Sequence, residues 1–132
     1  MTQDTSKWDY RFFEESEFAC HCCGVTKMDA EFMRKIINLR LAFAGPIIVN
    51  SGYRCAEHNK AVGGNEHSAH LEGKAADIKV MGERAGKFMG LADYCGFKGI
   101  GVNQKGGWAS RFIHIDTADA TKDRPRPWVW SY

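Results

Sequence analysis

Apolar and polar residues repeat along this chain at two spacings, which predict two long helices and several short strands. From Phe32 to Phe43 the apolar positions recur at roughly helical spacing, and Asp29 is placed to cap the start of that helix. Gly45-Pro46 should end it. A second helix is predicted over residues 83–94, with Gly96 just beyond its end.

Short runs rich in valine and isoleucine predict the strands of a sheet. They cover residues 47–50, 75–80, 99–103 and 111–116, and a short helix is expected over 56–61. We expect the first strand to be buried and a Gly-rich hairpin turn to join the last two. The aromatic, proline-broken tail is expected to be irregular coil. Helices combined with mostly antiparallel strands predict an α+β domain with a small sheet.

Composition restricts the class of protein. A chain of 132 residues with 44% hydrophobic and 26% charged residues is typical of one soluble globular domain. Residues 1–11 are interpreted as a leader and residues 12–132 as the domain. A net charge of +2 without a Lys/Arg cluster argues against a nucleic-acid partner. No segment has the length and apolarity of a signal peptide or membrane span, so we expect cytoplasmic synthesis, no membrane association and a monomer.

Two histidines and one carboxylate form the candidate chemical centre. Alternate side chains of a strand share a face, so Asp77 and His114 can point to the same side of the sheet. Gly73 allows the preceding loop to turn and bring His70 back over the strand. Three N/O ligands with a fourth position left to water are typical of a hydrolytic zinc site. We therefore predict a Zn²⁺ site here, with ordinary half-buried histidines as the alternative.

The same region resembles a known family. The resemblance is carried by Ser-x-His-x-x-Gly-x-Ala-x-Asp-Ile over residues 68–78, by Ser-Gly-Tyr-Arg over 51–54 and by His-Ile-Asp over 114–116. Together they resemble the zinc D-Ala-D-Ala carboxypeptidases (peptidase family M15), especially the short members of bacteriophages and prophages. The likeness extends from about residue 12 to about residue 130. It implies a Hedgehog/DD-peptidase-like fold with zinc held by His70, Asp77 and His114.

The resemblance also implies roles for Arg54 and Ser68. The matching arginine of the family lies beside the metal and binds substrate oxygens, and the matching serine helps to hold substrate. A guanidinium suits this role because its planar fork binds a carboxylate through two hydrogen bonds or polarises a carbonyl. Without the resemblance, Arg54 would be a solvated strand end and Ser68 a loop-capping hydroxyl.

The general base is less well defined. Several relatives carry an acidic residue or a histidine two or three positions before the last zinc ligand, where this chain has Arg111 and Phe112. The nearest carboxylate on the same face is Asp116, about 7 Å along the strand from His114 at a rise of ~3.4 Å per residue. Asp116 is either the catalytic base or a residue that orients a zinc-binding histidine. His67 is a weaker candidate for the base.

Five cysteines raise a separate question. Cys20, Cys23 and Cys55 together with His58 can form a structural zinc site of the Cys3His type. A disulfide from Cys20 or Cys23 to Cys55 is a second interpretation, and reduced thiols that pack as small hydrophobes are a third. Cys95 is expected to be a buried free thiol.

The function that the resemblance implies is a zinc metallopeptidase that hydrolyses peptide bonds in the stem peptides of peptidoglycan. Either a D-Ala-D-Ala carboxypeptidase or an endolysin-type endopeptidase fits. The likeness to bacteriophage proteins suggests a lysis factor that a holin releases from the cytoplasm to the cell wall. The alternative is a non-catalytic zinc-binding module of the same fold, which the missing acidic residue before His114 favours and the presence of Arg54 and Ser68 disfavours.

Overall fold

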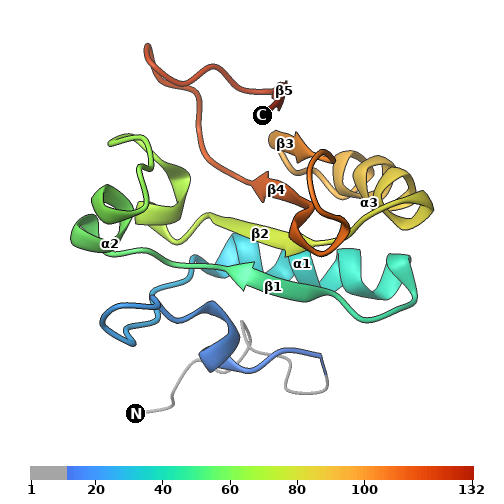
Figure 1. Ribbon diagram of the computed structural model, residues 1–132, viewed down its shortest axis with the longest axis horizontal. Helices are drawn as coiled ribbons and strands as arrows, with labels where there is room; N and C mark the ends of the chain where they lie inside the picture. The colour runs from blue at the N-terminus through green and yellow to red at the C-terminus, as the bar shows by residue number, and fades with distance from the viewer. Residues whose placement is uncertain (1–11) are drawn as a thin grey trace.

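One sheet and the helices packed on it make up residues 12–132, the part of the chain that the computed structural model describes (Figure 1). The predicted leader, residues 1–11, lies outside the described residues. The α-helices are α1 (Ala30–Phe43), α2 (Ala56–Ala61) and α3 (Glu83–Tyr94). Short 3₁₀ helices are η1 (Glu15–Phe18), η2 (Ala69–Glu72) and η3 (Trp108–Ser110). The strands are β1 (Ile48–Ser51), β2 (Ala75–Lys79), β3 (Gly99–Asn103), β4 (Phe112–Asp116) and β5 (Trp128–Ser131).

The strands lie side by side in the order β1-β2-β4-β3-β5. Pairings among the first four are antiparallel, and β5 runs parallel to β3. The α+β class and the mostly antiparallel sheet predicted from the sequence are therefore confirmed. Within residues 12–132, no helix has the length and apolar character required to cross a membrane.

Local signals set the helix limits. The side chain of Asp29 accepts a hydrogen bond from the backbone N–H of Phe32 and caps α1, as predicted. Ala44 ends α1 with a left-handed backbone (φ 56°), immediately before Gly45-Pro46. The buried faces of α1 and α3 pack with the apolar side of the sheet in one core, to which Phe32, Ile36, Phe88, Ile78, Ile113 and Ile115 belong.

The strand register places the polar candidates on the other side of the sheet. Asp77 of β2 is paired with His114 of β4, which is paired with Gly101 of β3, which in turn is paired with Trp130 of β5. The neighbouring positions Ile78 and Ile113 alternate to the core side. A row of four residues thus crosses the sheet opposite the helices.

Two predictions about strands were wrong. The strand after Pro46 is an edge strand rather than a buried one, and Ile48 is 55% exposed. The tail is not irregular coil throughout, because Trp128–Ser131 forms β5 beside β3, with the N–H of Trp128 bonded to the carbonyl of Lys98. Pro125 and Pro127 both precede β5, so the N–H groups of the strand remain available for pairing. In Figure 1 the chain after β4 extends away from the sheet and then returns, so that β5 lies at the edge of the sheet next to β3.

Candidate functional site

Three buried side chains from three different elements meet on the polar side of the sheet. His70 comes from η2, Asp77 from β2 and His114 from β4, with 2%, 8% and 6% of their surfaces exposed. Oδ1 of Asp77 lies 3.2 Å from Nε2 of His70 and 3.1 Å from Nδ1 of His114. The structure therefore brings together the three residues that the sequence proposed as metal ligands, with one ligand atom from each lying within 4.8 Å of the others.

The outer nitrogen of each histidine fixes the ring tautomer. Nδ1 of His70 lies 2.7 Å from the carbonyl oxygen of Gly52, which can only accept, so this nitrogen carries the proton. Nε2 of His114 lies 2.7 Å from Oδ2 of Asp116 and donates to that carboxylate. In the neutral rings, Nε2 of His70 and Nδ1 of His114 consequently present lone pairs to Asp77.

Three acceptor atoms pointing at one another require a cation or a proton between them. When a proton occupies this position, burial still opposes ionisation of Asp77, but the hydrogen bonds that His114 and His70 then donate hold its pKa well below the usual range. Burial alone would lower the pKa of His114, whereas its bonds to Asp116 and Asp77 raise it above the ordinary value. Zinc bonds of about 2.0–2.2 Å in a tetrahedron place neighbouring N and O ligands about 3.4 Å apart. The donor set and its spacing thus fit a divalent ion such as zinc.

Asp116 is fully enclosed and uses both carboxylate oxygens. Its Oδ2 is bonded to His114 and to Nη2 of Arg126 at 2.8 Å, and its Oδ1 accepts from Nε of Arg126 at 2.9 Å and from the N–H of Ala118 at 3.2 Å. Burial would raise the pKa of Asp116, but these bonds from His114 and Arg126 lower it to about 2. With 0% exposure, the carboxylate has no direct access to water in the cleft. Its position favours the orienting role over that of the base.

Arg126 was not predicted as a site residue, because this arginine lies in the tail that we expected to be coil. Its side chain is only 8% exposed and pairs with Asp116. A β-carbon on Gly99 would lie within 2.5 Å of the Asp116 carboxylate, so the absence of a side chain there makes room for this ion pair.

Arg54 reaches the metal-binding candidates from the loop between β1 and α2. Its guanidinium donates to Ser51 Oγ at 3.3 Å, to Asn59 Oδ1 at 3.3 Å and to Oδ2 of Asp77 at 3.2 Å. Arg54 therefore holds one oxygen of Asp77 while the other faces the two histidines. The side chain is 15% exposed, so it borders the cleft rather than lying in solvent.

A cleft of about 640 Å³ opens above these residues. Arg54, His70, Asp77 and His114 line it, together with residues of the 62–69 loop and a wall from the C-terminal segment that includes Trp128, Trp130 and Tyr132. The ring centroids of Trp130 and His114 are 5.1 Å apart. A β-carbon on Gly101 would lie 2.5 Å from the Trp130 indole, so the close approach of this ring to β3 requires glycine. The aromatic composition of the tail was the only sequence signal for this wall.

Ser68 and His67 lie at the side of the cleft. Ser68 Oγ accepts a hydrogen bond from the N–H of His70 at 3.2 Å and caps η2, the alternative role considered above. The His67 side chain is 55% exposed, with Nε2 3.5 Å from Glu66 and 4.0 Å from Asp123. Both residues line the cleft, so each is placed where it can contact a bound substrate.

The cysteines form a second cluster, and its composition differs from the predicted one. Cys20, Cys22, Cys23 and Cys55 each place a sulfur atom within 4.8 Å of the others. His58 is not a member, since its ring lies against that of His21 at a centroid distance of 5.8 Å. Cys22 takes the place that we predicted for His58, because the tight turn after η1 brings Cys20, Cys22 and Cys23 together beside Cys55.

No disulfide joins these residues or Cys95, and all five are free thiols. Cys95 is half-buried instead of fully buried.

Comparison with known proteins identifies one family. The sequence model of the family described as Peptidase M15 matches residues 11–116. The matched part contains the His70–Asp77–His114 group, Arg54 and the four clustered cysteines, and it ends before Arg126 and β5. A comparison with curated proteins gives no match.

Proposed function

The chain belongs to the peptidase M15 family, and from this premise we propose that it is a zinc metallopeptidase that cleaves peptide bonds in the stem peptides of peptidoglycan. The observation that carries the proposal is the convergence of three acceptor atoms, from His70, Asp77 and His114, at the bottom of a cleft that Arg54 also lines. Such a centre beside a guanidinium suits hydrolysis of a carbonyl compound.

In this proposal the ion is held by Nε2 of His70, Oδ1 of Asp77 and Nδ1 of His114. Zinc, when bound, supplies Lewis-acid chemistry that polarises the scissile carbonyl and makes water more acidic. Gly52 supports the site by accepting the Nδ1 proton of His70, and Asp116 does so by accepting the Nε2 proton of His114. These outer contacts keep both rings in the tautomer that presents a lone pair to the ion.

Arg54 is proposed to bind substrate oxygen. Its guanidinium already lies 3.2 Å from Asp77, so a carbonyl or carboxylate oxygen bound to it would be next to the ion site. If the enzyme is a carboxypeptidase, the same planar fork would bind the terminal carboxylate of the stem peptide. Arg124 and Arg126 also line the cleft, but their guanidinium groups are already paired with Glu72 and Asp116.

The proton of the attacking water needs an acceptor, and we assign this role to the imidazole of His67. Unlike Asp116, His67 lines the cleft with an exposed ring. Its Nε2 lies 3.5 Å from a carboxylate oxygen of Glu66 and 4.0 Å from one of Asp123. Asp116 and Arg126 are assigned to positioning His114.

The finer assignment follows the likeness to phage members of the family. We propose a lysis factor that cleaves the wall either as a D-Ala-D-Ala carboxypeptidase or as an endopeptidase, and that reaches the wall through a holin.

Digestion of purified sacculi tests the activity. We expect zinc-loaded protein to release peptide products, and a chelator to stop the release. Mass spectrometry of the products separates the two activities, because a carboxypeptidase liberates single D-alanine residues and an endopeptidase liberates larger stem fragments. Intact sacculi after prolonged incubation with zinc-loaded protein would contradict the proposal.

A second candidate is a zinc-binding module without catalysis. The observation that favours it is the enclosure of Asp116 between His114 and Arg126, combined with Arg111 and Phe112 where several relatives carry an acidic residue or a histidine. This function predicts that the protein binds zinc and sediments with sacculi but releases no product, so the same digestion distinguishes the two.

A further inference from the structure

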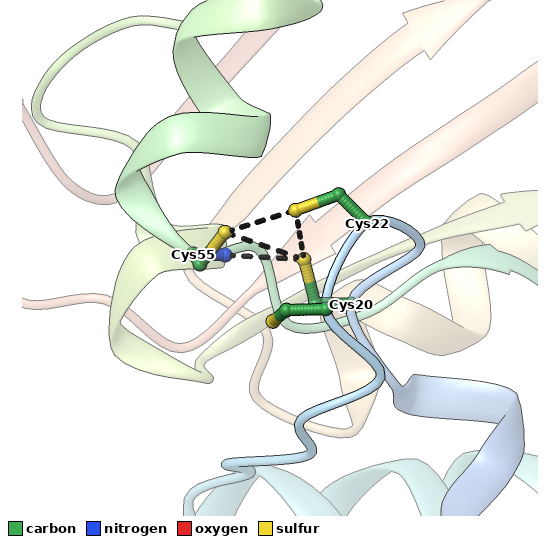
Figure 2. Close-up of side chains that lie close together, drawn as sticks. Cys20, Cys22 and Cys55 are labelled. Atoms are coloured by element: carbon green, nitrogen blue, oxygen red, sulfur yellow. Dashed lines mark hydrogen bonds between the residues drawn. The ribbon is translucent and has the colours of Figure 1, made fainter.

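Four cysteines meet on the side of the domain where the N-terminal segment contacts the loop after β1. Cys20, Cys22 and Cys23 belong to one tight turn after η1, and Cys55 stands immediately before α2. Figure 2 shows Cys20 and Cys22 on the N-terminal loop facing Cys55 at the start of the helix. The cluster is separate from the cleft, since none of its members lines it.

Three of the sulfur atoms lie close to the spacing of a tetrahedral metal site, and the sulfur of Cys23 lies within 4.8 Å of them. The Sγ atoms are 3.7 Å apart for Cys20 and Cys22, 3.6 Å for Cys20 and Cys55, and 3.2 Å for Cys22 and Cys55. Four thiolates at the usual Zn–S distance of about 2.3 Å lie about 3.8 Å from one another. A disulfide would instead bring one pair to about 2.05 Å and leave the other two cysteines without a role.

The backbone is shaped to hold this arrangement. The N–H of Cys20 bonds to the carbonyl of Val25, and the N–H of Gly24 bonds back to the carbonyl of Cys20, which closes the turn. Gly24 adopts φ 73°, a conformation that favours glycine. The N–H of Cys55 donates to the Cys20 sulfur, and that of His58 donates to the Cys55 sulfur, both at 3.4 Å. Such donors stabilise the negative charge of thiolate ligands.

We propose that Cys20, Cys22, Cys23 and Cys55 bind a second zinc ion that is structural. Four thiolates complete a tetrahedron and leave no position for water or substrate, which is the pattern of structural zinc sites. Soft sulfur ligands in this geometry select zinc over magnesium or calcium.

The ion would connect two segments that the active site depends on. Tyr53 donates its N–H to the carbonyl of Phe18 at 2.9 Å, and a β-carbon on Gly52 would lie 2.7 Å from Cα of Phe18, so the two segments already pack without space between them. Gly52 accepts the proton of His70, and Arg54 contacts Asp77. Zinc bound to Cys20 and Cys55 would therefore fix the loop that positions Arg54 and the His70 ring.

Metal analysis tests the proposal by difference. We expect Cys22→Ser and, independently, Cys23→Ser to contain about one zinc fewer per chain than wild type, since each removes one exposed thiolate ligand. Cys95→Ser is the matched control, because it removes the fifth cysteine, which lies outside the cluster, and should keep the wild-type zinc content. The difference is independent of the histidine site: if that site binds no ion, the wild type should contain about one zinc and Cys22→Ser about none.

Thiol counting on the wild-type chain gives a result that does not depend on the folding of a variant. In native protein only Cys95 should react with a thiol reagent, because zinc protects the four clustered cysteines, and all five thiols should react after chelation and denaturation. Three reactive thiols after denaturation without reductant would indicate a disulfide and overturn the proposal. Unchanged zinc in both serine variants, or iron in place of zinc, would also overturn it.

Discussion

Nε2 of His114 lies 2.7 Å from Oδ2 of Asp116, two residues further along β4. The pair links a candidate metal ligand to a carboxylate that is itself held by Arg126. The contact and the complete burial of Asp116 favour a role in supporting His114, since a base must reach the water that it deprotonates.

Replacement of Asp116 by asparagine tests this assignment. The amide oxygen of Asp116→Asn can still accept the Nε2 proton of His114, so we expect zinc affinity or turnover to fall by about 10–100-fold. The shape of the pH–rate profile should remain. Loss of its acidic limb with zinc fully bound would show that Asp116 is the base.

Asp119→Asn is the control for that variant. Asp119 is an exposed carboxylate three residues beyond Asp116 that pairs with Lys98 at 3.2 Å. Its replacement should change neither zinc binding nor turnover.

Substitution of Arg54 by lysine tests the role of the guanidinium. Lysine retains the charge but cannot donate at once to Ser51, Asn59 and Asp77, as Arg54 does. We expect turnover on a peptidoglycan peptide to fall ten-fold or more, about 1.4 kcal/mol, with zinc retained.

Arg111→Lys serves as the comparison for Arg54→Lys. Arg111 donates to the carbonyl of Gly106 and does not line the cleft, so this change should leave the kinetics unaltered. Equal kinetics for the Arg54→Lys variant and the wild type would reduce Arg54 to a structural role.

Gly101→Ala tests the packing of the aromatic wall. The added methyl group would lie 2.5 Å from the Trp130 indole, so the ring must move away from His114. We expect a loss of about 1–3 kcal/mol in the free energy of unfolding, measured by denaturant titration, and a change in tryptophan fluorescence.

Gly86→Ala is the control for Gly101→Ala. Gly86 lies in α3 and has no atom within 4 Å of the added β-carbon, so alanine should stabilise the protein by about 0.5–1 kcal/mol. Similar destabilisation by both alanines would show that Trp130 does not constrain Gly101.

The central pairing of the site could be predicted from the sequence because it depends on strand periodicity. Asp77 and His114 lie in isoleucine-rich segments with an alternation of two, and that alternation alone places both on the face opposite the core. Gly73 likewise marked the turn that returns His70, and it has a φ of 68°. These features are local, so the residues themselves encode them.

The parts that could not be predicted depend on contacts between distant segments. No periodicity links Arg126 to Asp116, and only the course of the tail brings them together. The choice of Cys22 over His58 depends on the turn around Gly24, whose geometry is not visible in the C-x-x-C spacing. The edge position of β1 follows from strand order, which short apolar runs do not specify.

The proposed dependence of hydrolysis on an ion at the histidine site is tested most directly by metal depletion and reconstitution. Peptide release from sacculi is measured for the chelated protein while zinc is returned stepwise, with His70→Ala and His114→Ala carried through the same titration. We predict that wild-type release is lost on chelation and recovers as zinc binds, and that neither variant recovers because each lacks one of the three ligands. Undiminished release by the fully depleted wild type, or full recovery in both variants, would contradict the proposed zinc centre.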